Sequence, residues 1–202
     1  MIAGGQIPGG LILAGGLSRR FGSGHKGLAV LRGRPLIAHV IQRVAPQCGP
    51  FALNINGDAS AFRGFGLPIV PDTLPGYPGP LAGVLAGLRW LAREAPGHPL
   101  LTVTVDEPFV PLDLARRLFD ARSPIAFATS GGQAHWLATL WSPEVADDLD
   151  RALRVDGITR IRDFVARHPA AGVEFGAGPP DPFFNINTPE DLEQAARFMG
   201  AP

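Results

Sequence analysis

Short, continuous apolar runs alternate along this chain with longer segments in which apolar residues recur at helical spacing. Continuous runs predict strands that are buried on both faces, as in parallel sheets, and helical spacing predicts amphipathic helices. The predicted strands are 11–14, 51–55, 67–70, 99–105, 124–128, 136–141 and 182–186. The predicted helices are 35–45, 59–65, 81–94, 111–121, 143–153, 158–167 and a last one that begins after Thr188 as its N-cap.

This alternation of strands and helices predicts an α/β fold with a doubly wound, mostly parallel sheet and helices on both faces. The run 136–141 is the candidate for one antiparallel strand. With 202 residues, of which 46% are hydrophobic, the chain is long enough for one domain with a full core. We find no repeat or linker in the sequence, and we therefore expect a single domain over 1–202 with a flexible N-terminal segment at 1–9.

The composition excludes several classes of function. No apolar run approaches the roughly 20 residues of a membrane span, and the N-terminus lacks the basic and apolar regions of a secretory signal. Cys48 is the only cysteine, so neither an internal disulfide nor a cysteine metal cluster can form. The formal net charge is zero, and no basic patch is interleaved with aromatic residues. We expect a cytoplasmic protein whose partners include neither a membrane nor a nucleic acid.

The candidate chemistry begins where the first predicted strand ends. The segment 15–28 holds several glycines, two arginines and Lys26. Glycines allow backbone N–H groups to approach phosphate oxygens closely, and the cations neutralise phosphate charge. Residues 1–57 contain six cationic residues and neither Asp nor Glu. These features predict a nucleotide-phosphate loop.

Two generic phosphate motifs fit this loop poorly. Segment 22–27 spells G-x-G-x-x-G, but that dinucleotide fingerprint follows its strand directly and has an acidic residue about 20 positions later. Here the predicted strand ends well before Gly22, and the first carboxylate after the loop is Asp58. A Walker A loop needs Gly-Lys-Ser/Thr, whereas this chain has His25-Lys26-Gly27.

Lys26 is the only lysine among 18 cationic residues. A composition so strongly biased toward Arg would have placed Arg here if any positive charge sufficed. The ammonium of Lys is compact and fits among phosphate oxygens, whereas the guanidinium of Arg is a broad planar fork. We therefore interpret Lys26 as a phosphate ligand rather than a stray surface charge.

Glycines or polar residues mark the ends of four predicted strands. Gly15-Gly16 follow the first strand, Asn54 lies at the end of the second, Asp72 follows the third and Asp106 follows the fourth. Ligands of doubly wound sheets bind outside the carboxyl ends of the strands. The sequence therefore predicts one shared site at this edge of the sheet.

Four segments carry a resemblance to a known family: 13–28, 77–83, 106–111 and 185–192. The text Leu-Ala-Gly-Gly-Leu-Ser-Arg-Arg-Phe-Gly from Leu13, followed by Lys26-Gly-Leu, resembles the signature of the molybdenum cofactor guanylyltransferases. These belong to the wider nucleotidyltransferases that share the L-A-G-G start. The chain departs from the usual signature with Phe21 in place of Met and His25 in place of Asp.

The resemblance covers almost the whole chain and implies a Rossmann-like nucleotidyltransferase fold. It implies that the phosphate of molybdopterin attacks the α-phosphate of GTP and releases pyrophosphate. It also implies Mg²⁺ as cofactor, with other cofactor-biosynthesis or acceptor proteins as candidate partners. Carried over by position, the nucleotide would be bound by Leu13, Ala14, Gly15, Gly16, Lys26, Asn54, Asp72, Gly79 and Asp106. The metal would be held by Asp106, and Asn185 and Asn187 would lie on the pterin side.

A phosphate nucleophile needs no strong base at neutral pH, so catalysis would consist of positioning and charge neutralisation. The implied catalytic residues are Arg19, Lys26 and Asp106. Mg²⁺ prefers one or two carboxylates together with substrate phosphate oxygens, which fits Asp106 and makes Glu107 a second candidate. His135 lies where the family often has His-Pro-Thr, and we favour a loop or core role for it over a substrate contact. Trp136 and Trp141 are expected to pack rather than to stack on a pterin.

Three alternatives stay open from the sequence. Cytidylyl transfer to the same cofactor and nucleotidyl transfer to a sugar phosphate both use an L-A-G-G loop. A nucleotide-binding regulatory module without catalysis is the alternative of another class, and His25 is the feature that favours it. The segments 78–83 and 185–189 favour guanylyl transfer.

Overall fold

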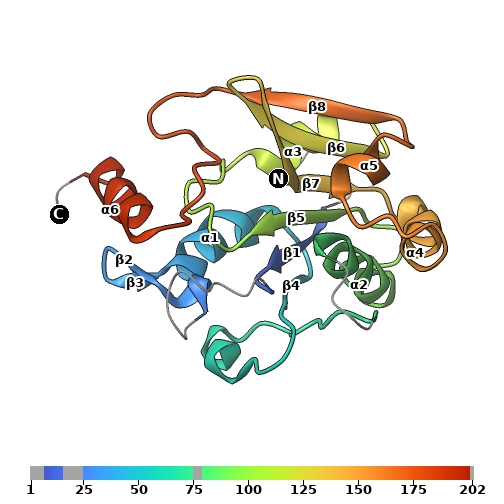
Figure 1. Cartoon of the computed structure of the whole chain (residues 1–202), viewed down its shortest axis with the longest axis horizontal. Coiled ribbons are helices and arrows are strands. Elements are labelled where there is room, and N and C mark those ends of the chain that lie inside the picture. The colour runs from blue at the N-terminus through green and yellow to red at the C-terminus, as the bar shows by residue number, and fades with distance from the viewer. Residues whose placement is uncertain (1–6, 16–24, 75–78, 201–202) are drawn as a thin grey trace.

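The computed structural model describes residues 7–15, 25–74 and 79–200, and within them a six-stranded sheet forms the centre of the molecule (Figure 1). The strand order is β4-β1-β5-β7-β6-β8. These strands are β1 (Gly9–Leu13), β4 (Phe51–Asn54), β5 (Leu100–Thr104), β6 (Ile125–Ser130), β7 (Gln133–Trp141) and β8 (Ala170–Phe175). β1 is parallel to β4 and β5, β6 is parallel to β8, and β7 runs antiparallel to both β5 and β6. The prediction of a mostly parallel sheet with one antiparallel strand is confirmed.

Helices cover both faces of this sheet (Figure 1). The α-helices are α1 (Leu36–Val44), α2 (Pro80–Glu94), α3 (Leu114–Asp120), α4 (Ala146–Arg154), α5 (Ile161–Val165) and α6 (Pro189–Phe198). The short 3-10 helices are η2 (Lys26–Leu28), η3 (Ala45–Gln47), η4 (Ser60–Phe65) and η5 (Pro143–Val145). The strands β2 (Val30–Leu31) and β3 (Arg34–Pro35) form a small antiparallel hairpin. In the described residues, α1 and α3 pack on one face of the sheet, and α2, α4 and α5 pack on the other.

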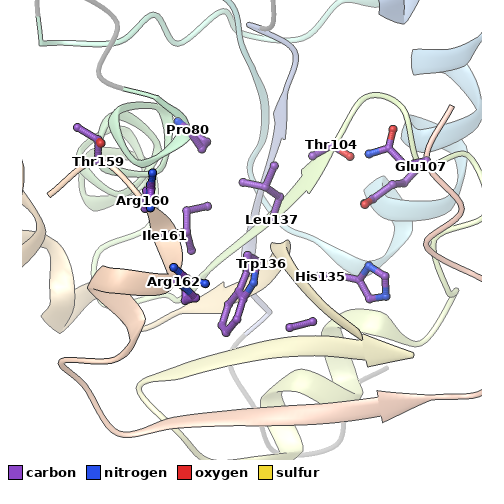
Figure 2. A pocket seen from close by; sticks show the side chains of 12 residues that line it. Pro80, Thr104, Glu107, His135, Trp136, Leu137, Thr159, Arg160, Ile161 and Arg162 are labelled. Carbon is purple, nitrogen blue, oxygen red and sulfur yellow. The ribbon is translucent and has the colours of Figure 1, made fainter. Parts of the chain in front are cut away.

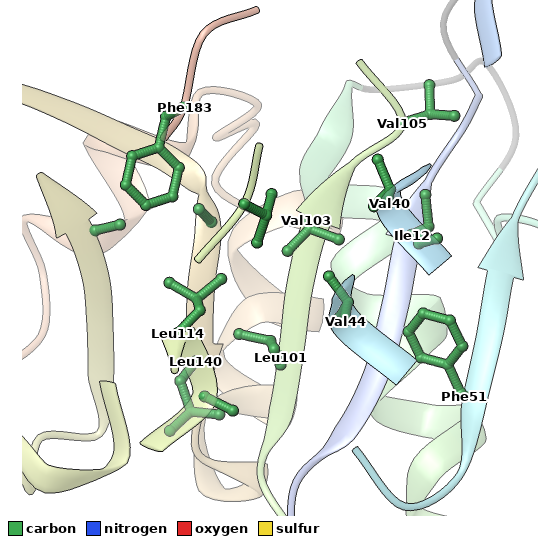
Figure 3. Close-up of a cluster of buried hydrophobic side chains, with 14 of the residues drawn as sticks. Ile12, Val40, Val44, Phe51, Leu101, Val103, Val105, Leu114, Leu140 and Phe183 are labelled. Atoms are coloured by element: carbon green, nitrogen blue, oxygen red, sulfur yellow. The ribbon is translucent and has the colours of Figure 1, made fainter. Parts of the chain in front are cut away.

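The two cores follow from the alternation of side chains along the strands. Ile12 of β1 faces α1 and joins one cluster, whereas Leu11 faces α2 and joins the other. Figure 3 shows the first cluster, in which Val40 and Val44 of α1 lie beside Ile12. Because both faces are covered, the central strands β1 and β5 are mainly apolar, as the continuous runs in the sequence indicated.

Glycines on α2 bring that helix close to the sheet. A Cβ on Gly87 would lie 2.5 Å from Leu11 Cδ2, and a Cβ on Gly83 would lie 2.5 Å from Asn54 Oδ1. Any larger side chain would push the helix away from β1 and β4. The close approach of α2 at Gly83 therefore helps to fix the position of Asn54.

The sequence-based elements differ from the structure in four places. The predicted strand 67–70 is reduced to a single bridge between Leu53 and Ile69, because Pro68 and Pro71 flank it and have no N–H to donate. The predicted strand 182–186 is irregular, and the last strand is instead β8 at Ala170–Phe175. The predicted helix 59–65 is the 3-10 helix η4, and the predicted helix 158–167 contains α helix only over Ile161–Val165.

At the C-terminal end, α6 begins as the sequence predicts. The Thr188 side chain accepts a hydrogen bond from Asp191 N, and the Asp191 side chain accepts one from Thr188 N, which completes a capping box. No helix in the described part of the chain is long and apolar enough to cross a membrane. Residues 1–6 of the segment expected to be flexible lie outside the described residues, and Gly9 is already part of β1. The single domain over 1–202 stays a prediction.

Candidate functional site

The carboxyl ends of β1, β4 and β5 meet at one edge of the sheet. Leu13 at the end of β1 is paired with Asn54 on one side and with Thr104 on the other. Ala14 N donates to Asn54 O at 3.0 Å, which continues this register beyond β1. Gly15 follows directly, so Leu13, Ala14, Gly15 and Asn54 lie at one edge of the sheet. Gly16 and Arg19 lie outside the described residues.

Asn54, Asn56 and Asp72 form a hydrogen-bonded network at this edge. Asn54 Nδ2 donates to Asp72 Oδ1 at 2.8 Å and to Val70 O at 2.9 Å. Asn56 Nδ2 donates to Asp72 Oδ2 at 2.8 Å, and Asp72 N donates back to Asn56 Oδ1 at 2.8 Å. Both oxygens of the Asp72 carboxylate are thus held by amide groups. Asn56 was missed by the sequence reasoning, although its position two residues after Asn54 could have indicated it.

Gly79 lies at the start of α2, as its N-cap. Its φ is +90°, a conformation that favours glycine, and its carbonyl accepts a hydrogen bond from Ala82 N at 3.2 Å. A Cβ at this position would lie 3.3 Å from Thr159 O. Gly79 therefore brings the start of α2 against the segment that precedes α5, which is also a boundary of the pocket described below.

Lys26 joins three predicted site residues. Its ammonium donates to Asp106 Oδ2 in an ion pair, to Asn187 Oδ1 at 2.8 Å and to Asn185 Oδ1 at 3.3 Å. The side chains of Lys26 and Asp106 are both 14% exposed, so the pair is largely sheltered from solvent. Ile186 N also donates to Asp106 O at 3.0 Å, which holds the segment 185–187 against the end of β5. The residues assigned to phosphate, metal and pterin thus form one cluster.

The Asp106 carboxylate fits the requirements of a divalent metal. Its Oδ1 is buried and has no hydrogen-bond partner among the described residues, and its Oδ2 is paired with Lys26. The described residues contain no group of three His, Cys, Asp or Glu side chains that could hold a metal by themselves. A site of one carboxylate completed by substrate phosphate oxygens is the arrangement that Mg²⁺ prefers.

Glu107, beside Asp106, is a buried carboxyl that is only 5% exposed. Burial, together with the negative charge of Asp106, raises the pKa of Glu107 to about 8. Its Oε2 has no hydrogen-bond partner in the described part of the chain. The sequence named Glu107 only as a second candidate metal ligand, because the spacing of residues does not reveal how deeply a side chain is buried.

Glu107→Gln is expected to stabilise the folded protein most strongly at alkaline pH. Between its ordinary pKa of 4.5 and its folded pKa of about 8, the folded chain keeps a proton that the unfolded chain releases. Stability therefore falls as pH rises through this window, and a neutral amide removes that loss. Melting temperatures of both proteins across the window test this, with Glu94→Gln on the exposed side of α2 as the control. A variant whose melting temperature stays parallel to wild type at every pH would contradict the assignment.

An open pocket of about 660 Å³ lies beside the Lys26 cluster. Figure 2 shows Glu107 and His135 on one side of it, Arg160 and Arg162 on the opposite side, and Trp136 between them. Its lining residues are Pro80, Thr104, Glu107, Ala134, His135, Trp136, Leu137, Thr159, Arg160, Ile161, Arg162 and Asn185. Asn185 contacts Lys26 as well, so the pocket and the Lys26 cluster are continuous.

An irregularity in β7 shapes this pocket. Phe127 of β6 is paired with Thr139, but the next residue, Ala128, is paired with His135, so residues 136–138 are left out of the ladder. Such a bulge re-aims side chains, and here Trp136 reaches the pocket, with its ring centroid 4.5 Å from that of Phe127. Trp141 is fully buried and donates to Thr102 Oγ1 at 3.0 Å, which confirms its expected packing role.

Two histidines that the sequence singled out have different environments. His25 packs edge-on against Phe62 with ring centroids 5.0 Å apart, so its aromatic ring supports the segment that carries Lys26. His135 lines the pocket, although the sequence favoured a loop or core role for it. Arg160 and Arg162 were missed altogether, and only their Arg-x-Arg spacing could have drawn attention to them.

Comparisons with known proteins identify the family and the fold of the chain. The sequence pattern of the MobA-like NTP transferase domain matches residues 10–171. A molybdenum cofactor guanylyltransferase of Rhodopseudomonas palustris (strain BisB5) is 50% identical over 193 residues, which cover 93% of this chain and 92% of that protein. Among solved structures, molybdopterin-guanine dinucleotide biosynthesis protein A from Archaeoglobus fulgidus has a TM-score of 0.74 at 24% identity, over 95% of this chain and 98% of that chain. A Mycobacterium tuberculosis protein solved in complex with manganese has a TM-score of 0.69 at 22% identity, over 95% of this chain and 99% of that chain.

Proposed function

The chain belongs to the molybdenum cofactor guanylyltransferases, a family of MobA-like NTP transferases, and on this premise we propose that it transfers GMP from GTP to the terminal phosphate of molybdopterin. An oxygen of that phosphate attacks the α-phosphorus of GTP, the bond from the α-phosphorus to the bridging oxygen breaks, and pyrophosphate leaves. The observation that carries the proposal is the contact of Lys26 with Asp106, Asn185 and Asn187 at the carboxyl edge of the sheet.

The nucleotide is proposed to bind over the ends of β1 and β4. Backbone groups of Leu13, Ala14, Gly15 and Gly16 would contact the nucleotide, and Gly79 would border the site from the start of α2. Asn54 and Asp72 would contact the nucleoside, and the network between them supports this because it fixes the orientation of the Asp72 carboxylate before a ligand arrives.

Asp106 is proposed to hold Mg²⁺, which would supply positive charge to the phosphates of GTP. The unpartnered Oδ1 of Asp106 supports the assignment. Lys26 would contribute a second positive charge at the same edge, and Arg19 is proposed to act with it, although that residue lies outside the described part of the chain. Because a phosphate nucleophile is already ionised at neutral pH, these residues need to position and neutralise charge rather than remove a proton.

Molybdopterin is proposed to enter the pocket next to the Lys26 cluster. Asn185 belongs to both sites and would lie between the two substrates, with Asn187 beside it. Arg160 and Arg162 offer guanidinium groups to an anionic acceptor from the far side of the pocket. The pocket therefore supplies an acceptor site within reach of the proposed phosphate site.

GTP with Mg²⁺ is expected to stabilise the folded chain more than CTP with Mg²⁺ does. A ligand at 100 times its dissociation constant adds about 2.7 kcal/mol to the free energy of unfolding. Melting curves with GTP, CTP, ATP and UTP at matched concentrations measure the preference directly. A larger rise in melting temperature with CTP than with GTP would indicate cytidylyl transfer instead of guanylyl transfer.

Pyrophosphate release separates an enzyme from a regulatory nucleotide-binding module. We expect release only when GTP, Mg²⁺ and molybdopterin are all present. Tight binding of GTP without pyrophosphate release under those conditions would favour the non-catalytic alternative. Pyrophosphate release with a sugar phosphate in place of molybdopterin would identify the sugar phosphate as the acceptor.

A further inference from the structure

His135 is held by a chain of hydrogen bonds that the catalytic cluster does not use. His135 Nε2 lies 2.7 Å from Ser130 Oγ, and Ser130 Oγ donates to Asp181 Oδ2 at 2.8 Å. Asp181 Oδ1 accepts a hydrogen bond from Phe183 N at 2.8 Å. The chain joins β6, β7 and the segment after β8, three parts of the sequence that meet behind the pocket.

The direction of these hydrogen bonds fixes the tautomer of His135. A serine hydroxyl carries one proton, and the Asp181 carboxylate, which accepts hydrogen bonds on both oxygens, receives it. Ser130 Oγ can therefore only accept from His135, so Nε2 carries a proton. The ring also stacks on Phe183, with centroids 4.4 Å apart and planes 23° apart, which fixes its orientation.

The second nitrogen of the ring, Nδ1, has no hydrogen-bond partner among the described residues. Burial lowers the pKa of His135 more strongly than the nearby charges of Asp181 and Glu174 raise it, which favours the neutral ring. In a neutral ring with Nε2 protonated, Nδ1 carries a lone pair and accepts a hydrogen bond. His135 lines the pocket, and Nδ1 is the ring nitrogen that the hydrogen bonds to Ser130 and Asp181 leave for a molecule bound there.

We propose that His135 Nδ1 accepts a hydrogen bond from an N–H or O–H donor on the acceptor substrate, and that Ser130 and Asp181 position the ring for this contact. The proposal rests on the proposed function only in identifying the occupant of the pocket as the acceptor. His135 is then a specificity-determining residue: an acceptor lacking the donor would leave Nδ1 unpaired. In the proposed arrangement GTP lies over the ends of β1 and β4, and it is not expected to contact His135.

The tautomer can be tested without turnover. Nitrogen chemical shifts of the His135 ring in ¹⁵N-labelled protein should show a proton on Nε2 and a lone pair on Nδ1. Adding molybdopterin alone should move the Nδ1 resonance, because the lone pair then accepts a hydrogen bond. Ser130→Ala removes the acceptor of the Nε2 proton, and we expect the two neutral tautomers to become mixed in that variant.

Kinetics of three variants test the contact itself. His135→Leu should raise the KM for molybdopterin by about tenfold, the loss expected for one neutral hydrogen bond at the upper end of its range, while the KM for GTP stays near wild type. His135→Asn places an amide oxygen close to the position of Nδ1 and should recover part of the loss. Ser130→Ala keeps the ring and should give a smaller increase in the same KM.

Four outcomes would overturn the proposal: a proton on Nδ1 in the wild type, an Nδ1 resonance that does not respond to molybdopterin, an unchanged KM for molybdopterin in His135→Leu, or equal increases in both KM values. If His135→Leu does not fold, Ser130→Ala provides the test: the KM for molybdopterin should rise while the KM for GTP stays near wild type. A wild type that shows the Nδ1 response but releases no pyrophosphate would refute the proposed reaction and leave this contact standing. An active wild type without the response refutes the contact alone.

Discussion

Asp106→Asn is expected to lower the rate of guanylyl transfer at least about 100-fold, because a bound metal contributes several kcal/mol of charge stabilisation. The side chain lies just beyond β5 at the edge of the sheet, so the substitution does not disturb the apolar clusters on either face. An amide oxygen can still accept a hydrogen bond from Lys26, but the variant loses the negative charge that holds a divalent cation. The fold should therefore persist while metal-dependent turnover fails.

The measurement is steady-state turnover as a function of Mg²⁺ concentration, beside a melting curve. Asp147→Asn is the matched control, because Asp147 also forms an ion pair, with Arg89, but its side chain is 89% exposed and belongs to α4. Near-normal turnover of Asp106→Asn at limiting Mg²⁺ would mean that another residue holds the metal, and Glu107 would be the next residue to substitute.

Much of the fold could be predicted from the sequence because covered strands leave a clear signal. The predicted strands 11–14 and 99–105 are mainly apolar, and their ends mark the edge at which Asp106 lies. β8 left no such signal. Its first five residues alternate between exposed and partly buried, and only Phe175 is buried. Gly172, where a Cβ would lie 3.2 Å from Thr129 Cγ2, interrupts the apolar pattern.

The grouping of side chains within the site could be predicted only in part. Asn54 ends β4 and Asp72 follows the bridge between Leu53 and Ile69, so the rule that ligands bind at the carboxyl ends of parallel strands could place them at the same edge. The contacts of Lys26 with Asn185 and Asn187 join residues about 160 positions apart, at the start and the end of the described chain. No local pattern encodes that contact. The same is true of the Asp181–Ser130–His135 chain, which depends on the register of β6 and β7 and on the path of the segment after β8.

Lys26→Arg is expected to reduce guanylyl transfer by about 10²–10³-fold, the usual cost of losing one well-placed donor to developing negative charge. The ammonium of Lys26 donates to oxygens of Asp106, Asn185 and Asn187, which converge on a single nitrogen. A guanidinium spreads its donors over a wider plane and cannot place one nitrogen among three such oxygens. Gly27, the next residue, leaves little room for adjustment, because a Cβ there would lie 2.5 Å from Val105 Cγ2.

Lys26→Ala should be at least as slow as Lys26→Arg, and it should also melt at a lower temperature, because it leaves the largely buried Asp106 carboxylate without its partner. Arg93→Lys, on an exposed position of α2, controls for the exchange of one cation for the other. The comparison separates a requirement for charge from a requirement for shape: Lys26→Arg keeps the charge, so any loss of rate beyond that of the control measures the shape of the donor. Wild-type turnover in Lys26→Arg would mean that the positive field of residues 1–57 is sufficient, and that the presence of the only lysine at this position has no catalytic significance.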